Sequence, residues 1–126
     1  LVVASECSEG MGSPEYVDAQ RRLVGLGPEG FLRGIEGKRF ADVDEWQTQM
    51  QLKTMRRARV HLYAPALAAA DRALTGVNVV ESVEAAVLAS VRASGDRHVA
   101  VIPEGPYVVP VLRERVVRRA APSSRT

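Results

Sequence analysis

The feature that most constrains the fold is an alternation of short apolar segments with helical ones in the second half of the chain. Apolar stretches at 60–63, 77–80 and 99–102 predict strands, and residues 66–74 and 83–94 between them predict helices. Strand–helix–strand units at this spacing imply parallel strands joined by helical crossovers. Because the predicted strands are apolar on both faces, we expect the sheet to be covered on both sides.

The opening of the chain predicts one further strand and a helix start. Residues 1–7 are expected to form a buried strand, and residues 8–13 a glycine-bearing loop. Ser13 is a favourable N-cap, and Pro14 is favourable at the first helical position. This helix should end near residue 25.

Two more helices are expected before the second strand. Pro28 opens a short one that runs to residue 35, and Asp42 or Asp44 caps one that runs to about residue 57. The predicted fold class is therefore α/β, a three-layer domain with a mostly parallel sheet in the order β-α-α-α-β-α-β-α-β and helices on both faces. A last extended segment is expected at 107–112.

Charge is unevenly distributed between the body of the chain and its end. The net charge is +2, and residues 113–126 carry five arginines and one glutamate, so the remainder is mildly acidic. We expect one domain over residues 1–112 and a disordered basic tail over 113–126. A nucleic-acid-binding arm is the alternative, but the tail lacks interleaved aromatic residues, so no nucleic-acid partner is expected.

The beginning of the chain and its cysteine content bear on the cellular compartment and on whether the chain is part of a longer protein. The first apolar run is too short for a signal peptide or a membrane span, so we expect no membrane partner. It begins without methionine, which favours a segment of a longer chain. The single cysteine, Cys7, excludes a disulfide framework within the chain and fits a cytoplasmic protein.

Two polar loops follow predicted strands, where ligands of parallel sheets usually bind. The loop with Gly10 and Gly12 could present backbone N–H groups to an anion, although a tight turn that needs glycine is the alternative. Glu104 lies in a loop stiffened by two prolines and a glycine, which suits either a binding edge or a strand terminator. His61 and His98 stand apart without neighbouring cysteines, so no metal site is predicted.

Trp46 is the only tryptophan, and its helical neighbours leave its role open. Val43 and Met50 lie one turn away on either side, which is typical of a packing stripe. Tryptophan also keeps a polar N–H and often lies where a domain meets a ligand or partner. Gln47 and Gln51 fall on other helix faces and are expected to be solvated.

Four short motifs, taken in order, resemble the carboxyl-terminal domain of the nickel-dependent lactate racemase family of 2-hydroxyacid racemases and epimerases. The resemblance extends over about residues 1–112. The motifs are the loop Glu9-Gly10-Met11-Gly12, the Asp-x-Trp-x-x-Gln helix start within Asp44-Glu45-Trp46-Gln47-Thr48-Gln49, the β-α-β unit from residue 60 to Ser82-Val83-Glu84-Ala85-Ala86, and Val101-Ile102-Pro103-Glu104-Gly105.

The resemblance implies a division of labour between two domains. The family's amino-terminal domain carries the nickel pincer nucleotide cofactor on a lysine, together with the nickel-binding and catalytic histidines. The carboxyl-terminal domain closes the cleft and faces a small 2-hydroxyacid substrate. By this resemblance no catalytic or metal residue lies in this chain, which would bind no cofactor alone and be inactive in isolation. Its substrate-facing or cofactor-facing residues would be Trp46, Gln49, Gly10, Gly12 and Glu104.

One departure bears on the substrate, and one alternative bears on the function. Met11 stands where several relatives have histidine, which points to a 2-hydroxyacid other than lactate. The alternative function is a non-catalytic module of the same α/β fold that binds a small molecule or a protein.

Overall fold

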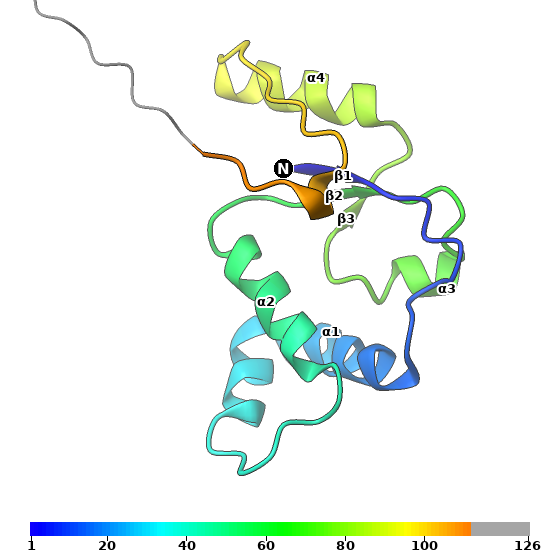
Figure 1. Ribbon diagram of the computed structural model, residues 1–126, viewed down its shortest axis with the longest axis vertical. Coiled ribbons are helices and arrows are strands. Elements are labelled where there is room, and N and C mark those ends of the chain that lie inside the picture. The colour runs from blue at the N-terminus through cyan, green and yellow to red at the C-terminus, as the bar shows by residue number, and fades with distance from the viewer. Residues whose placement is uncertain (112–126) are drawn as a thin grey trace, which may run out of the picture. The chain divides into compact units, whose positions relative to one another are not determined.

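The computed structural model describes residues 1–111, and within them it has an α/β fold of four helices and a small parallel sheet (Figure 1). The chain divides into two compact units, Leu1–Asp96 and Arg97–Thr126, which are described separately. The elements of the first unit are β1 (Val2–Ala4), α1 (Pro14–Ile35), α2 (Glu45–Met55), β2 (His61–Tyr63), α3 (Ala69–Arg72), β3 (Asn78–Val79) and α4 (Val83–Ser94).

The three strands pair in parallel in the order β1-β2-β3, which confirms the predicted α/β class. Val3 lies opposite Leu62, and Leu62 lies opposite Val79. The strands are shorter than expected, and the first one is not buried, since Val3 is 39% exposed. The prediction of a buried strand at 1–7 is therefore wrong, because apolar composition alone does not ensure that other elements cover both faces.

α1 is two helical segments joined at a kink, as the sequence predicts. Gly27 has non-helical angles (φ 71°, ψ 170°), and Pro28 follows it. At the start, the Ser13 hydroxyl accepts a hydrogen bond from the Tyr16 N–H at 3.0 Å, which confirms the predicted N-cap. The kink turns the second segment, so that both halves of α1 can pack against α2.

The core of this unit lies between α1 and α2. Ala19, Leu23 and Phe31 from α1 and Leu52 from α2 are buried in one cluster. Each large side chain buried in this way contributes about 1.5–3 kcal/mol relative to exposure. These contacts hold α2, and with it the residues at its start, in a defined place on α1.

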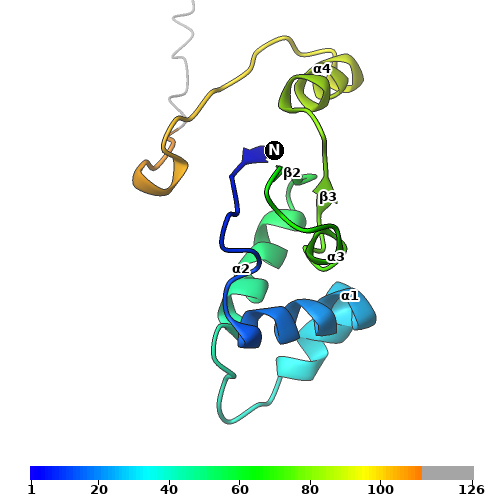
Figure 2. The same cartoon turned by 90° about the vertical axis from the view of Figure 1, so that its right-hand side faces the viewer.

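α4 follows its local signals closely. The Ser82 hydroxyl accepts from the Ala85 N–H at 3.1 Å, and Gly95 ends the helix in the left-handed region (φ 70°). Its closest packing is with β1. In both views of this unit, α4 lies on the other side of the strands from α1 and α2 (Figures 1 and 2). α3 is only four residues long, which is shorter than the predicted helix at 66–74.

Arg97–Thr126 holds the clearest disagreement with the sequence prediction. Residues 99–102 form no strand, and Val101 is 83% exposed. A strand requires hydrogen bonds to a neighbouring strand, and this segment has none among residues 1–111. A 3₁₀ turn, η1 (Gly105–Tyr107), replaces the start of the extended segment expected at 107–112. The basic tail predicted at 113–126 lies outside the described residues. Across residues 1–111, no helix is both long and apolar enough to cross a membrane.

Candidate functional site

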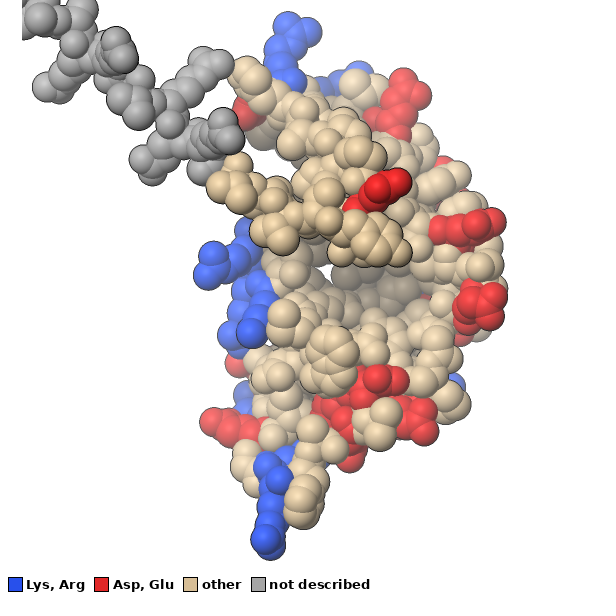
Figure 3. Space-filling view, viewed as in Figure 1, with Lys and Arg blue, Asp and Glu red and all other residues tan. Residues whose placement is uncertain are grey.

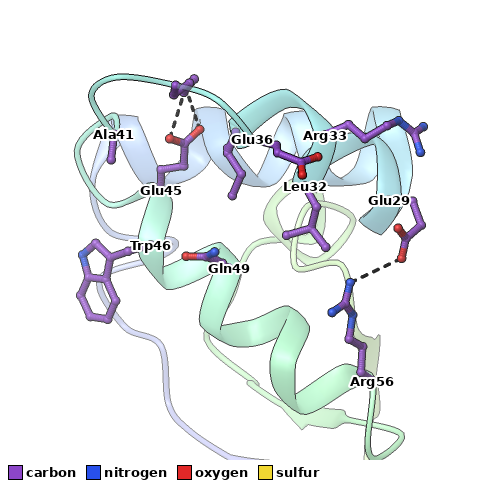
Figure 4. A pocket seen from close by; sticks show the side chains of 11 residues that line it. Glu29, Leu32, Arg33, Glu36, Ala41, Glu45, Trp46, Gln49 and Arg56 are labelled. Atoms are coloured by element: carbon purple, nitrogen blue, oxygen red, sulfur yellow. Dashed lines mark hydrogen bonds and ion pairs between the residues drawn. The ribbon is translucent and has the colours of Figure 1, made fainter.

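Two of the sequence-predicted site residues, Trp46 and Gln49, line the same hollow between α1 and α2. This α1–α2 hollow has a volume of about 530 Å³, within the range of small-molecule pockets. Figure 4 shows the Trp46 indole projecting from the start of α2, while Glu29 and Arg56 lie at the opposite end. The side chain of Gln49 is exposed and has no hydrogen-bond partner among residues 1–111, so both its donor and its acceptor are available to a ligand.

A buried carboxylate fixes the start of α2 beside Trp46. Glu45 is only 3% exposed, and its Oε1 accepts from Arg22 Nη1 at 2.7 Å and from Lys38 Nζ at 2.9 Å. Glu45 Oε2 also accepts from the Asp42 N–H at 3.2 Å. We call Arg22, Lys38, Asp42 and Glu45 the charge cluster. It joins α1, the loop before α2 and the first residue of α2.

The charge cluster shifts the pKa values of its members in the direction expected for ion pairs. Burial by itself raises the pKa of Glu45, but hydrogen bonds from Lys38 and Arg22 and from the Asp42 N–H outweigh it and leave that pKa below 4.5. Hydrogen bonds to Asp42 and Glu45 raise the pKa of Lys38. Glu45 is therefore ionised at neutral pH, and this chemistry suits a structural anchor rather than a general acid.

The outer face of α2 and the loop before it expose large apolar side chains. Phe40, Val43, Trp46 and Met50 are all exposed, and Trp46 is exposed to 61%. We call these four residues the apolar stripe. Trp46 and Met50 lie one turn apart on α2, as predicted, but Val43 lies before the helix, on the other side of the left-handed Asp44. All three side chains are exposed, so their interpretation as core packing is wrong. A group of exposed apolar residues on a rigid helix is typical of a surface that meets a partner or ligand.

The glycine loop after β1 lies next to the start of α2. Ser13 Oγ donates to Asp44 Oδ2 at 2.5 Å, which links the residue after Gly12 to the residue before α2. Gly10 and Gly12 have positive φ (67° and 88°), as the tight-turn interpretation requires.

The surroundings of this loop are acidic. A Cβ on Gly10 would lie 3.6 Å from Asp71 Oδ2, and the carboxylate of Asp44 contacts Ser13. Figure 3 shows acidic side chains gathered where α1 and α2 begin. Carboxylates at these positions oppose anion binding, so the surroundings favour the tight turn over the anion cradle.

Gln51 is an interior bridge, so its predicted solvation is wrong. Its Oε1 accepts from Gln20 Nε2 at 2.8 Å, and its Nε2 donates to the Thr75 carbonyl at 2.7 Å. Gln20 also donates to Thr48 Oγ1 at 3.1 Å. These bonds tie α1, α2 and the segment before β3 together, while Gln20 Oε1 is buried without a hydrogen-bond partner among residues 1–111. Gln47 is exposed, as predicted, and donates to Asp44 Oδ1 at 2.9 Å.

The remaining candidate residues are not gathered at the α1–α2 hollow. Gly10 lines a separate hollow of about 190 Å³ together with Cys7, and Gly12 lines neither of the two. Glu104 belongs to the second unit, where it is exposed with a left-handed backbone (φ 55°). The structure thus brings Trp46 and Gln49 into one hollow and places Gly12 near them through Ser13 and Asp44.

No nickel site can be built from the residues described. Among residues 1–111 no group of three His, Cys, Asp or Glu side chains could hold a metal ion. His61 Nδ1 lies 2.7 Å from Asn78 Nδ2 across the β2–β3 pair, which is a structural contact. No chemical step through a metal is therefore derived from these residues.

The sequence interpretation missed the charge cluster and Ser13 as parts of the site. One local signal was available, since Asp42 and Glu45 stand three residues apart at a helix start, and the Glu45 side chain reaches back to the Asp42 N–H as in half of a capping box. The contribution of Arg22 carries no such signal, because Arg22 lies on α1, 23 residues from Glu45 in the sequence.

Comparison of the chain with family models, with curated proteins and with solved structures finds no match.

Proposed function

We propose that this chain is the carboxyl-terminal, cleft-closing domain of a cytoplasmic 2-hydroxyacid racemase or epimerase of the lactate racemase family. In the complete enzyme it would complete a three-layer domain with helices on both faces of a mostly parallel sheet. Its partners would be the enzyme's own amino-terminal domain and a small 2-hydroxyacid. When bound by that other domain, a nickel pincer nucleotide would supply the hydride acceptor.

The observation that carries the proposal is the exposure of Trp46 on a rigid support. An indole that is 61% exposed next to a hollow of about 530 Å³ contributes little to the core of this unit. Its helix is nevertheless anchored by Glu45, which is almost completely buried. The order of the four motifs, with Trp46 in the Asp-x-Trp motif, assigns this exposed ring to the wall of an active-site cleft.

Within this proposal, each side chain at the α1–α2 hollow has a physical task. The Trp46 ring covers the reacting atoms and excludes water, because a transferred hydride must not meet a proton source. The free Gln49 amide can donate to a carboxylate or accept from a hydroxyl of the substrate. The charge cluster holds both residues in place and takes no part in the chemistry.

The experiment that tests this function is replacement of Trp46 in the complete enzyme, with the upstream coding sequence restored. We expect Trp46→Ala to lower kcat by about 100-fold, since misplacing a substrate by about 1 Å has an effect of this size. Met50→Ala, one helical turn further along the same face, is the matched control and should change kcat by less than about threefold.

Two results would contradict the proposal. The first is racemisation of any 2-hydroxyacid by the purified 126-residue chain alone. The second is a complete protein that neither binds nor racemises 2-hydroxyacids, which would favour a non-catalytic binding module. Loss of about 3 kcal/mol of stability in Trp46→Ala, with activity kept in the folded fraction, would instead assign Trp46 to packing.

A further inference from the structure

Asp44 has an unusual conformation for a residue that precedes a helix. It occupies the N-cap position of α2, but its backbone is left-handed (φ 60°, ψ −1°) and its side chain makes no capping hydrogen bond. Aspartate at this position normally caps its own helix from an extended backbone. Left-handed geometry in a residue other than glycine is strained, and such strain concentrates at ligand-binding and switch regions. Asp44 therefore bears strain without capping its own helix.

The Asp44 carboxylate instead joins two segments that lie far apart in the sequence. Its Oδ2 accepts from Ser13 Oγ at 2.5 Å, 31 residues away, and its Oδ1 accepts from Gln47 Nε2 at 2.9 Å. Ser13 Oγ also accepts from the Tyr16 N–H and so caps α1. Hydrogen bonds to an ionised acceptor are stronger than neutral ones. One carboxylate thus connects the start of α1 to the start of α2.

The start of α2 is stabilised by contacts that do not involve the Asp44 side chain. The Glu45 N–H donates to the Asp42 carbonyl at 3.3 Å, and the Asp42 N–H donates to Glu45 Oε2 at 3.2 Å. The first bond closes a backbone turn, and the second resembles half of a capping box, in which a glutamate side chain reaches back to an N–H three residues before it. Lys38 and Arg22 bind the same Glu45 carboxylate. A role in helix capping therefore does not account for the Asp44 conformation, whereas the bond to Ser13 does.

We propose that Asp44 is a positioning residue that holds the Gly10–Ser13 loop against the start of α2, so that the loop and Trp46 form one wall that faces the uncharged part of the substrate. Trp46 follows Asp44 by two residues, and Gly12 directly precedes Ser13, so the Ser13–Asp44 bond sets the spacing between the loop and the indole ring. The part concerning substrate rests on the proposed function. The structural part of the proposal, in which Asp44 holds the Gly10–Ser13 loop on α2, does not depend on the proposed function.

Four substitutions separate this role from capping and from backbone strain. Asp44→Gly removes the carboxylate and also relieves the left-handed strain. Asp44→Asn tolerates the same backbone and keeps an oxygen that accepts from Ser13. Ser13→Asp still caps α1, but it has no proton to donate at neutral pH and places a second negative charge beside Asp44. Ser13→Thr keeps both the hydroxyl and the cap.

The first measurement uses the 126-residue chain and backbone ¹⁵N order parameters at Met11, Gly12 and Ser13. We expect values of about 0.85 in the unsubstituted chain and in Asp44→Asn and Ser13→Thr. In Asp44→Gly and Ser13→Asp they should fall below about 0.6, while the α2 values stay near 0.85. Unchanged loop values in Asp44→Gly would overturn the proposal, because the loop would then be held by other contacts.

The second measurement uses the complete enzyme and separates failure of the positioning role from failure of the proposed function. We expect kcat to fall at least tenfold in Asp44→Gly and Ser13→Asp, with KM changed less than about threefold, and to be largely kept in Asp44→Asn and Ser13→Thr. An active enzyme whose kcat is the same in Asp44→Gly would overturn the positioning role and leave the proposed function standing. An unsubstituted enzyme that racemises no 2-hydroxyacid would overturn the proposed function, and with it the role of Asp44 in catalysis.

Discussion

The two faces of α2 differ in a way that ordinary hydropathy would not suggest. On the inner face, a carboxylate and a hydroxyl are buried with one leucine, at Glu45, Thr48 and Leu52. On the outer face, Trp46 and Met50 are exposed. Glu45 and Trp46 are adjacent in the sequence, yet the charged residue is buried and the aromatic one is not. A polar residue such as Glu45 is thus buried where other side chains donate hydrogen bonds to it. An apolar residue such as Trp46 is exposed where few of the described residues pack against it.

The largest expected effect comes from removing the apolar contact of the inner face. Leu52→Ala should lower the free energy of unfolding by about 3 kcal/mol, because it leaves a cavity in the α1–α2 core. Urea denaturation of the two chains measures the difference. Met50→Ala on the outer face is the matched control, with an expected loss below about 1 kcal/mol. Equal losses in the two variants would mean that the faces do not differ as described.

A smaller loss is expected when the buried carboxylate is neutralised. Glu45→Gln should lower the free energy of unfolding by about 2 kcal/mol, because Arg22 and Lys38 lose the buried one of the two carboxylates that they share, and only Asp42 remains. Their side chains remain 28% and 30% exposed, so water relieves part of the cost and the loss stays below that of a fully buried pair. Glu36→Gln, an exposed carboxylate of the same hollow, should change stability by less than about 0.5 kcal/mol. A Glu36 variant as destabilised as the Glu45 variant would contradict a specific role for the charge cluster.

The pH dependence of stability provides a further test of the inner face. The pKa of Glu45 in the folded chain lies below its ordinary value of 4.5, so its contribution is fully present above pH 4.5. That contribution is lost as the pH falls through the lowered folded pKa. We expect the stability gap between the unsubstituted chain and Glu45→Gln to shrink from about pH 6 to about pH 3, as measured by urea midpoints at each pH. A gap that is constant over this range would mean that Glu45 acts through packing rather than charge.

The smallest effect on stability is expected on the outer face. Trp46→Ala in this chain should change the free energy of unfolding by less than about 1 kcal/mol, since most of the indole is already in water. Fluorescence of this single tryptophan provides a second check, because acrylamide should quench it almost as efficiently as free tryptophan in solution. Strong protection from the quencher would show that the ring is covered in solution.

Local signals predicted the helices well because capping and kinking depend on neighbours in the sequence. Ser13 with Pro14, Gly27 with Pro28, and Ser82 with Gly95 mark helix starts, a kink and an end that the structure confirms. Residues 99–102 had an equally clear apolar pattern but form no strand. A strand needs backbone hydrogen bonds to a neighbouring strand, and the local sequence does not specify which segment that neighbour is. The wrong prediction that Gln51 is solvated has the same cause, because its hydrogen-bond partners Gln20 and Thr75 lie far from it in the sequence.

From the sequence alone follow the helices, the first three strands, the spacing of Trp46 and Met50 by one turn of α2, and the glycine turn after β1. Each of these follows from backbone preferences or from the helical period, which act over a few residues. Which face of α2 is buried does not follow from the sequence and is set by tertiary packing. That choice depends on Arg22 reaching Glu45 and on Ser13 reaching Asp44, and such partners are set by the packing of segments that are distant in the sequence.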